Sequence, residues 1–205
     1  MKINKKKFLY IISPNKIHGL FYKDLIKIFK LKKTSFFQLR LKKDSFKNKL
    51  KIGKKIKVIC KEYNVKLIIN DDPFLTKEIN ADGCHLGQND MQISDARKIL
   101  KKKIIGVSCH NSIKLVKKAT KDGADYVALG SFFKSKTKQN AIRSKIQIIN
   151  KAKKVSKLPV VCIGGITDKN YKKLILHKPN FLAISSYIWS NSKLKPKEAA
   201  KKIDL

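Results

Sequence analysis

The feature that most constrains this chain is an alternation of short, almost wholly apolar segments with longer segments rich in lysine. The apolar segments have strand length, and continuous hydrophobicity of this kind is typical of strands buried on both faces of a parallel sheet. The lysine-rich segments carry an apolar face at helical spacing, as at Ile52, Ile56 and Ile59, and their lysines suit a solvated outer face. The pattern therefore predicts repeated βαβ units.

The pattern repeats often enough to choose between two architectures. Strands are expected at residues 8–13, 36–42, 66–70, 83–87, 104–108, 126–131, 159–164 and 181–185. Helices are expected at residues 22–29, 46–63, 74–79, 93–101, 113–122, 146–155, 168–177 and 196–203. Eight such units in 205 residues match a compact (β/α)8 TIM barrel, so we expect an α/β fold with one catalytic domain over residues 1–205. An open doubly wound sheet of six or seven units is the alternative.

The chain shows no segment that would direct it to a membrane. No apolar run approaches the roughly 18 residues that a membrane span needs. The lysine-rich start leads into only a short apolar stretch without a cleavage site, so it does not resemble a secretion signal. We therefore expect a cytoplasmic protein without a membrane partner. The sequence is compatible with a homo-oligomer and does not determine the oligomeric state.

The formal charge of +35 raises the question of nucleic-acid binding. Only Arg40, Arg97 and Arg143 are arginines among 49 basic residues, and the lysines are spread along the whole length. Isoleucine (27) and asparagine (13) are abundant together with lysine, as A/T-rich codons would produce. A dedicated nucleic-acid binder uses arginine more often, because its planar fork binds phosphates and bases through two hydrogen bonds. We expect only weak, salt-sensitive polyanion binding and no specific nucleic-acid partner.

The four cysteines do not indicate a metal or disulfide framework. Cys60, Cys84, Cys109 and Cys162 form no C-x-x-C pair, and three of them lie in apolar segments, so we expect reduced thiols in the core. Cys109 is followed by His110, but neighbouring residues of a strand point to opposite faces. We therefore do not expect them to act as nucleophile and base.

Unusual polar residues follow several predicted strands, at the end where barrel enzymes carry their chemistry. Alternation places Gln38, Arg40 and Lys42 on one face of the second strand. Two cations side by side inside a barrel are costly unless an anion neutralises them, which favours a phosphate ligand. The alternative is that this face points outward to solvent.

Carboxylates follow the third and fourth strands. Asp71 and Asp72 end the third, and Asp90 lies beyond the fourth. Magnesium binds one or two carboxylates and takes its remaining ligands from substrate phosphate and water. Carboxylates at the ends of neighbouring strands therefore predict a site for a hard cation, and we assign Asp71 to the metal and Asp72 to the cap of the following helix. His85, in the fourth strand, is typical of a core histidine with satisfied hydrogen bonds.

The later loops suit phosphate groups. Hydroxyl and ammonium groups alternate after the sixth strand, from Ser135 to Lys138. Gly164-Gly165 follows the seventh strand, where backbone N–H groups can approach a phosphate, and Ser185-Ser186 follows the eighth. From the residues alone we predict a barrel with a magnesium-dependent site for phosphorylated ligands. The reaction stays undetermined at this point.

Seven of these segments together resemble the thiamine phosphate synthase family, also called thiamine-phosphate pyrophosphorylases, over about residues 36–186. The matching segments, in chain order, are Gln38-Leu39-Arg40-x-Lys42, Ile69-Asn70-Asp71-Asp72, Ala81-Asp82-Gly83-Cys84-His85-Leu86-Gly87-Gln88-x-Asp90, Ile105-Gly106-Val107-Ser108-Cys109-His110, Gly123-Ala124-Asp125-Tyr126-Val127-Ala128-Leu129-Gly130, Ser135-x-Thr137-Lys138 and Ile163-Gly164-Gly165-Ile166. In the loop after the sixth strand the family usually has Pro-Thr-x-Thr-Lys, where this chain has Lys134-Ser135-Lys136-Thr137-Lys138.

The resemblance implies a (β/α)8 transferase that joins 4-amino-2-methyl-5-hydroxymethylpyrimidine diphosphate to a thiazole phosphate, often carboxylated. The products are thiamine phosphate and pyrophosphate. In the family the pyrimidine–oxygen bond breaks first, and the thiazole nitrogen captures the resulting cation. Cations aimed at the leaving pyrophosphate stabilise that transition state.

The resemblance also implies roles for individual residues. Arg40, Lys42, Ser108 and Lys138 are implied in catalysis, with Mg²⁺ on Asp71 and Asp90. The implied substrate contacts are Gln38, Leu39, Arg40, Leu41, Lys42, Asn70, Ser108, Ser135, Lys136, Thr137, Lys138, the Gly165 backbone, Ser185 and Ser186.

Two rival functions remain to be compared with this one. A related thiazole tautomerase would share the fold and could use His110 for proton transfer, but it has no need of the Asn70-Asp71-Asp72, Gln88-x-Asp90 and Thr137-Lys138 segments. A nonenzymatic polyanion-binding protein would depend on overall charge rather than on a few residues at strand ends.

Overall fold

A computed structural model describes residues 7–17, 19–134 and 143–204, and these form a closed barrel of parallel strands in the order β1 to β8. The strands are β1 (Leu9–Ile12), β2 (Thr34–Leu39), β3 (Lys66–Asn70), β4 (Gly83–Leu86), β5 (Ile104–His110), β6 (Tyr126–Leu129), β7 (Val160–Ile163) and β8 (Phe181–Ile184). The helices are α1 (Phe21–Phe29), α2 (Phe46–Glu62), α3 (Pro73–Ile79), α4 (Ile93–Leu100), α5 (Ile113–Lys121), α6 (Ile148–Val155), α7 (Tyr171–Ile175), α8 (Ser186–Trp189) and α9 (Pro196–Lys201).

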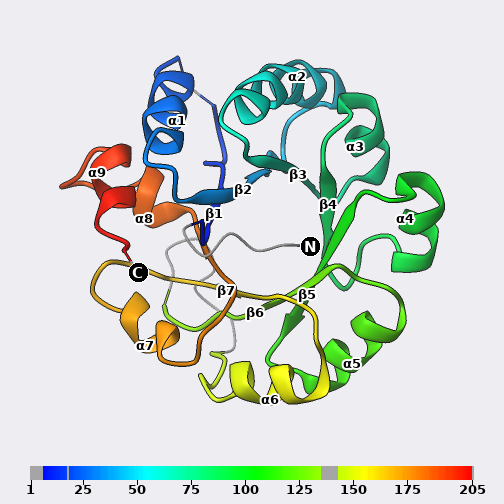
Figure 1. Cartoon of the computed structure of the whole chain (residues 1–205). Helices are drawn as coiled ribbons and strands as arrows, with labels where there is room; N and C mark the ends of the chain where they lie inside the picture. The colour runs from blue at the N-terminus through cyan, green and yellow to red at the C-terminus, as the bar shows by residue number, and fades with distance from the viewer. Residues whose placement is uncertain (1–6, 18, 135–142, 205) are drawn as a thin grey trace.

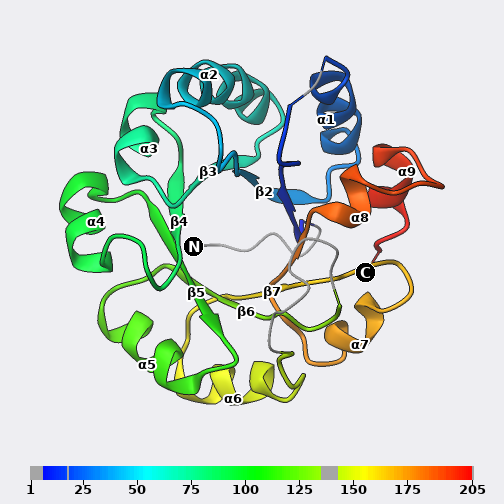
Figure 2. The ribbon, with the colours of Figure 1, turned by 180° about the vertical axis from the view of Figure 1, so that it is seen from behind.

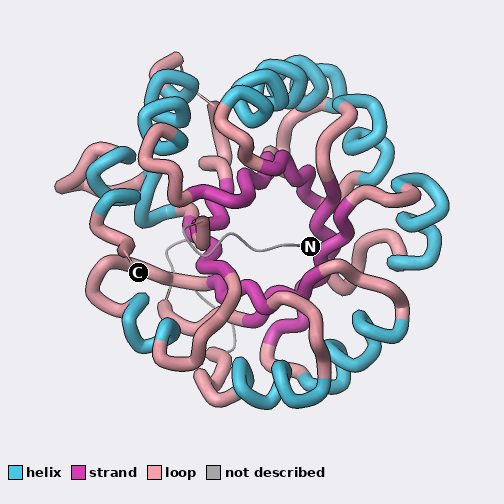
Figure 3. Tube along the Cα trace, viewed as in Figure 1, coloured by secondary structure: helices cyan, strands magenta, loops and turns pink. Residues whose placement is uncertain are grey.

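The barrel closes because β1 pairs with both β2 and β8 in parallel register. In Figure 1 and in the reverse view of Figure 2, the helices form a ring outside the strands. Figure 3 shows the strands as a continuous inner circle. The predicted (β/α)8 barrel is confirmed, and the open doubly wound sheet is excluded.

Most element boundaries agree with the sequence pattern, with three informative differences. The second strand ends at Leu39 rather than at residue 42, so Arg40 and Lys42 lie in the loop that follows it. β5 extends two residues beyond the prediction, to His110. The short helix α8 was not predicted; the Trp189 Nε1–H holds it against the end of β1 through a 2.7 Å hydrogen bond to the Ile12 carbonyl oxygen.

One apolar cluster consists of strand residues alone and fills the inside of the barrel. Its members are Tyr10, Ile12, Phe36, Ile68, Tyr126, Ala128, Val161, Phe181 and Ala183. The rings of Phe36 and Phe181 pack edge to face with centroids 4.9 Å apart. Position 106 requires glycine, because a Cβ there would lie 1.9 Å from Tyr126 Cζ. A glycine in β5 thus makes room for a tyrosine from β6.

A second cluster packs between the strands and the helices and contains residues of both. It includes all four cysteines, which are buried and unpaired. Burial raises the pKa of the Cys84 and Cys109 thiols to about 12, so both stay protonated at neutral pH. The expectation of reduced core thiols is confirmed. Within the described ranges, no helix is both long and apolar enough to span a bilayer.

A polar residue just before each of β4, β6 and β8 accepts a hydrogen bond from the backbone of the preceding strand. Asp82 accepts a hydrogen bond from the Leu67 N–H, Asp125 accepts one from the Ile105 N–H, and the Asn180 amide oxygen accepts one from the Val160 N–H. These groups lie where the strands begin, away from the end that carries chemistry in such barrels. Asp82 and Asp125, which lie in the segments that resemble the thiamine phosphate synthase family, therefore stabilise the fold.

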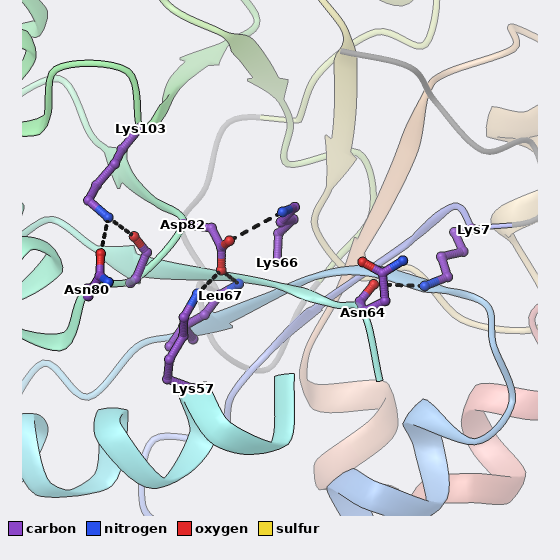
Figure 4. A network of polar contacts seen from close by, with 9 residues as sticks. Lys7, Lys57, Asn64, Lys66, Leu67, Asn80, Asp82 and Lys103 are labelled. Atoms are coloured by element: carbon purple, nitrogen blue, oxygen red, sulfur yellow. Dashed lines mark hydrogen bonds and ion pairs between the residues drawn. The ribbon is translucent and has the colours of Figure 1, made fainter. Parts of the chain in front are cut away.

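Asp82 is the centre of a wider network (Figure 4). Lys57 Nζ lies 2.6 Å from Asp82 Oδ2, and Lys66 Nζ lies 3.4 Å from its other oxygen. Burial alone would raise the pKa of Asp82, but the hydrogen bonds from Lys57 and from the Leu67 N–H, together with both lysine charges, hold it below its usual value. The carboxylate therefore ties α2, β3 and β4 together in its charged form.

Candidate active site

The catalytic end of the barrel is defined by residues that continue the inward-facing positions of the strands. Gln38, Asn70 and Ser108 each follow an inward-facing residue by two positions in β2, β3 and β5. Alternation therefore directs all three toward the barrel mouth, as the sequence predicted for Gln38.

A continuous chain of hydrogen bonds crosses the barrel interior between two of these residues. Gln38 Nε2 donates to Tyr10 Oη at 2.9 Å, and Tyr10 Oη lies 2.8 Å from Tyr126 Oη. His85 Nδ1 lies 2.9 Å from Tyr126 Oη, and His85 Nε2 lies 2.9 Å from Ser108 Oγ. The prediction that His85 is a core histidine with satisfied hydrogen bonds is confirmed, because both ring nitrogens have partners.

The two tyrosines in this chain of hydrogen bonds, Tyr10 and Tyr126, are neutral. Both are fully buried, and burial raises the pKa of Tyr10 and of Tyr126 well above the ordinary value of 10. The ring of His85 stacks on that of Tyr126 with centroids 5.6 Å apart and planes 20° apart. Both hydroxyls therefore keep their protons at neutral pH and can act as hydrogen-bond donors.

Two carboxylates and a lysine meet at the ends of β2, β3 and β4. Lys42 Nζ lies 3.2 Å from Asp71 Oδ2. Asp90 Oδ2 accepts a hydrogen bond of 2.6 Å from the Gly87 N–H. Partial burial and the neighbouring Asp71 carboxylate raise the pKa of Asp90 above its usual value, against the opposing effects of the Gly87 N–H and Lys42. The structure thus brings Asp71, Asp90 and Lys42 together.

The adjacent residues Asp71 and Asp72 have different tasks. Asp72 Oδ1 accepts a 2.8 Å hydrogen bond from the Leu75 N–H and so caps α3, as predicted. Asp71 has a left-handed backbone with φ of 65°, and its N–H bonds the His85 carbonyl oxygen at 2.8 Å. Such a conformation costs a non-glycine residue about 1 kcal/mol, and functional sites are where it is commonly retained. The left-handed backbone of Asp71, beside the extended backbone of Asp72, points the two carboxylates in different directions.

A cavity of about 440 Å³ opens beside this cluster. Its lining residues are Leu39, Leu41, Lys42, Lys49, Ile69, Asn70, Asp71, Asp72, Pro73, Phe74, Leu75, Asp90 and Met91. Leu39 and Leu41 are buried side chains of the outer apolar layer and contribute apolar surface to the cavity. The residues of the hydrogen-bond chain inside the barrel, hereafter the interior chain, are not among the described residues that line the cavity. The cavity therefore lies to one side of the barrel mouth.

The carboxylate cluster suits a hard cation with few protein ligands. Nowhere in the described part of the chain do three or more His, Cys, Asp or Glu residues gather closely enough to hold a metal ion. A pair of carboxylates is what Mg²⁺ requires when phosphate and water complete its coordination. The donor set of Asp71 and Asp90 therefore fits magnesium and does not suit zinc.

The loops after β7 and β8 form a second group of predicted residues. Gly164 and Gly165 have φ of 107° and 62°, and residues 131–134 pack directly on them. A Cβ on Gly165 would lie 2.4 Å from the Lys134 carbonyl oxygen. Ser185 Oγ donates to the Ser13 carbonyl oxygen at 3.2 Å, and Ser186 begins α8. The predicted contacts Ser135, Lys136, Thr137 and Lys138 lie outside the described residues.

Cys109 and His110 do not form a reactive pair. Cys109 is fully buried in the outer apolar layer, whereas His110 is exposed at the end of β5 with φ of 49°. The expectation that the two side chains point to opposite faces is confirmed.

Three residues of the site were missed from the sequence. Tyr10 and Tyr126 belong to the interior chain, and Ser13 connects the ends of β1, β2 and β8. The tyrosines carried a signal, because a tyrosine within a strand buried on both faces needs a hydrogen-bond partner for its hydroxyl. Ser13 carried none, since a serine before Pro14 also suits an ordinary turn.

The fold and the site together define a (β/α)8-barrel enzyme with its polar residues at the carboxyl ends of the strands. The family model described as "Thiamine monophosphate synthase" matches residues 9–188 of the chain. The chain is 60% identical over 206 residues to the thiamine-phosphate synthase of Pelagibacter ubique (strain HTCC1062), covering 99% of this chain and 100% of that protein. It is 41% identical over 157 residues to that of Nitrosomonas eutropha (strain DSM 101675 / C91 / Nm57), covering 76% and 74% of the two chains.

Solved structures agree with this assignment. The thiamine phosphate pyrophosphorylase from Pyrococcus furiosus superposes with a TM-score of 0.84 at 26% identity, over 96% of this chain and 93% of the other. The 3-hexulose-6-phosphate synthase from Salmonella typhimurium, at 18% identity and a TM-score of 0.72, shares the fold over 95% and 96% of the two chains. The chain belongs to the thiamine monophosphate synthase family, and its activity is that of a thiamine-phosphate synthase, a transferase.

Proposed function

We propose that the enzyme joins 4-amino-2-methyl-5-hydroxymethylpyrimidine diphosphate to a thiazole phosphate, with Mg²⁺ held by Asp71 and Asp90. The observation that carries this proposal is the cluster of Asp71, Asp90 and Lys42 at the ends of β2 to β4. An ammonium group and a metal ion can both neutralise diphosphate oxygens. Partial burial, together with the neighbouring Asp71 carboxylate, raises the pKa of Asp90, so this pair of carboxylates gains from a bound metal ion.

Bound Mg²⁺ supplies charge neutralisation for the diphosphate oxygens. The remaining work falls to side chains of the chain itself. Lys42 is already at the cluster, 3.2 Å from Asp71, and Arg40 lies two residues earlier in the same loop. We assign both to the diphosphate, where a guanidinium can bind two oxygens and an ammonium contributes a point charge. Lys138 is assigned to the same leaving group from the resemblance alone.

The proposed reaction has two bond changes. The bond between the pyrimidine methylene carbon and the diphosphate oxygen breaks, and its electron pair leaves with pyrophosphate. The thiazole nitrogen then donates its lone pair to the methylene carbon and forms the new C–N bond of thiamine phosphate. Negative charge gathers on pyrophosphate as the first bond lengthens, so the cations stabilise the transition state more than the ground state. No side-chain nucleophile takes part.

The two substrates would occupy different groups of strand ends. Gln38, Asn70 and Ser108 face the barrel mouth and would orient the pyrimidine, and Leu39 and Leu41 line the cavity beside it. The thiazole phosphate would bind Ser135, Lys136, Thr137, the Gly165 backbone, Ser185 and Ser186. Paired glycines with positive φ present backbone N–H groups that can bind a phosphate.

The test is the formation of thiamine phosphate and pyrophosphate by the purified protein supplied with both heterocycles. The assay is run with Mg²⁺, with a chelator, and with Mg²⁺ restored after chelation. The proposal predicts coupling that the chelator abolishes and that Mg²⁺ restores. Coupling that proceeds unchanged in chelator would refute the magnesium assignment, and binding of both ligands without coupling would refute the proposed reaction.

A further inference from the structure

The interior chain of hydrogen bonds has a defined direction. It runs from Gln38 through Tyr10, Tyr126 and His85 to Ser108, with each link between 2.8 and 2.9 Å. Gln38 Nε2 is a donor and has no lone pair to accept with, so Tyr10 Oη accepts from it. Tyr10 is fully buried and has one proton, and among the described residues Tyr126 is the other hydrogen-bond partner of its hydroxyl, so Tyr10 donates to Tyr126 Oη.

The same reasoning extends to the other end. Tyr126 has accepted from Tyr10, so its own proton goes to His85 Nδ1. A neutral imidazole that accepts at Nδ1 carries its proton on Nε2, and it therefore donates to Ser108 Oγ. A protonated His85 would donate from both nitrogens and leave the Tyr126 proton without this acceptor inside the barrel, which is costly for a buried group.

The direction determines what each end presents to a ligand. Gln38 uses its NH₂ group inside the barrel, and its amide oxygen remains as an acceptor. Ser108 accepts from His85, and its proton remains to be donated elsewhere. The two ends thus offer one acceptor and one donor. An aminopyrimidine has the complementary pattern, since its amino group donates and its ring nitrogens accept.

We propose that Tyr10, Tyr126 and His85 are positioning residues that set the hydrogen-bonding polarity of Gln38 and Ser108 toward the pyrimidine. This inference rests on the proposed function for its ligand. Reversing one link alone would set two donors or two acceptors against each other, so Gln38 and Ser108 can change polarity only together. The three residues act through their neighbours and do not need to touch the substrate.

The central test removes one hydroxyl in the middle of the chain. Tyr126→Phe keeps the ring that fills the space above Gly106 and deletes only the oxygen. We expect kcat/KM for the pyrimidine diphosphate to fall by about tenfold, which is the effect of losing about one hydrogen bond that orients the substrate. The KM for the thiazole phosphate should change by less than about twofold. Tyr10→Phe should show the same split between substrates.

The control is Tyr171→Phe. Tyr171 is also buried and its hydroxyl accepts a hydrogen bond, from the Asp204 N–H at 3.4 Å, but it lies on α7 outside the barrel. We expect its kinetics with both substrates to match the wild type. A loss in Tyr126→Phe that affects both substrates equally, or that Tyr171→Phe reproduces, would overturn the positioning role.

A measurement without substrate separates this inference from the proposed function. Nitrogen-15 NMR of the histidine side chains, with His85 assigned by comparison with His85→Asn, should show the Nε2–H tautomer in the wild type. Tyr126→Phe should convert it to a mixture of tautomers. An Nδ1–H or doubly protonated His85 in the wild type at neutral pH would refute the polarity. Absent coupling with the expected tautomer would refute only the proposed reaction.

Discussion

The backbone N–H of Arg40 donates a 2.9 Å hydrogen bond to the hydroxyl oxygen of Ser13. The carbonyl oxygen of the same serine accepts a hydrogen bond from Ser185 Oγ at 3.2 Å. Ser13 follows β1, Arg40 follows β2 and Ser185 follows β8, so one residue joins three neighbouring strand ends. It connects the side of the site assigned to the diphosphate with the side assigned to the thiazole phosphate.

Ser13→Ala should therefore weaken catalysis without unfolding the barrel. The substitution deletes the acceptor of the Arg40 N–H, and a lost hydrogen bond of this kind is worth about 1 kcal/mol, or about fivefold in kcat/KM. Steady-state kinetics with both substrates provide the measurement. Ser112→Ala is the matched control, because Ser112 caps α5 through the Leu115 N–H and is not among the residues assigned to a substrate or to the metal. Equal kinetic losses in both variants would contradict the role of Ser13.

The two adjacent aspartates after β3 should respond differently to the same change. Asp71→Asn should lower the coupling rate by on the order of a hundredfold or more, because the ligand charge for Mg²⁺ is lost beside the diphosphate. Asp90→Asn should do the same. Asp72→Asn should retain near wild-type turnover, since asparagine also caps helices and Asp72 Oδ1 serves the Leu75 N–H.

The measurement is turnover as a function of Mg²⁺ concentration, with circular dichroism to show that each variant is folded. Wild-type activity and Mg²⁺ dependence in Asp71→Asn would assign the metal to other groups. A loss in Asp72→Asn as large as in Asp71→Asn would show that the two residues are not separated as the structure indicates.

Arg40→Lys should damage catalysis although it conserves charge. A lysine ammonium is a point charge and cannot bind two phosphate oxygens as a planar guanidinium does. We expect kcat to fall by about tenfold or more. Arg97→Lys is the control, because Arg97 binds Asp125 at 2.7 Å and the Gly123 carbonyl oxygen at 2.9 Å in the outer structure. That variant should lose thermal stability and keep its kcat, and the opposite pattern would reverse the two assignments.

Much of the fold followed from the sequence because its signals are local. Strands buried on both faces and helices with one apolar face can be identified within single segments of the sequence. The eight predicted strands form the closed barrel that their number suggested. The division between Asp71 and Asp72 was also local, since a carboxylate before a helix is a capping signal. The end of β2 was placed too late because its alternating pattern continues to Lys42 while pairing with β3 ends at Leu39.

The interior chain could not be predicted because it depends on contacts across the barrel. Tyr10 and Tyr126 are 116 positions apart, and no local pattern says that their hydroxyls meet. Only the closure of the barrel brings the two hydroxyls to within hydrogen-bond distance. The same holds for Ser13, whose partners Arg40 and Ser185 lie on the strands that flank β1.

Gly165→Ala should weaken binding of the thiazole phosphate. Gly165 has φ of 62°, and an added Cβ would lie 2.4 Å from the Lys134 carbonyl oxygen and 2.7 Å from that of Phe133. The loop after β6 would have to move, so we expect the KM for the thiazole phosphate to rise by about tenfold and that for the pyrimidine diphosphate to change little.

Gly123→Ala separates backbone strain from crowding. Gly123 has φ of 84°, but an added Cβ there would meet nothing within 4 Å. This control should cost about 1 kcal/mol of folding free energy and leave both KM values unchanged. Unchanged KM values in a folded Gly165→Ala protein would remove Gly165 from the phosphate site.

The Asp82 network should make stability depend on acidity below the usual aspartate range. The pKa of Asp82 is held below its ordinary value of 3.8 in the folded protein, where Lys57 and the Leu67 N–H bind its charged form. The stabilisation is therefore fully present above pH 3.8 and is lost as the pH falls through the folded pKa. Asp82→Asn should lower the free energy of unfolding by about 2 kcal/mol at pH 7, as expected for hydrogen bonds to a charged group.

Urea unfolding of wild type and Asp82→Asn at pH 7 and at pH 3 measures this directly. The difference between the two proteins should shrink at pH 3, because the unfolded wild-type chain takes up a proton on Asp82 below the ordinary pKa of 3.8 while the folded carboxylate resists it, and the variant has no such proton to take up. Asp95→Asn is the control, since Asp95 pairs with Lys98 on the exposed face of α4 and such pairs contribute little. A difference between Asp82→Asn and wild type that stays constant from pH 7 to pH 3 would show that the charge of Asp82 does not stabilise the barrel.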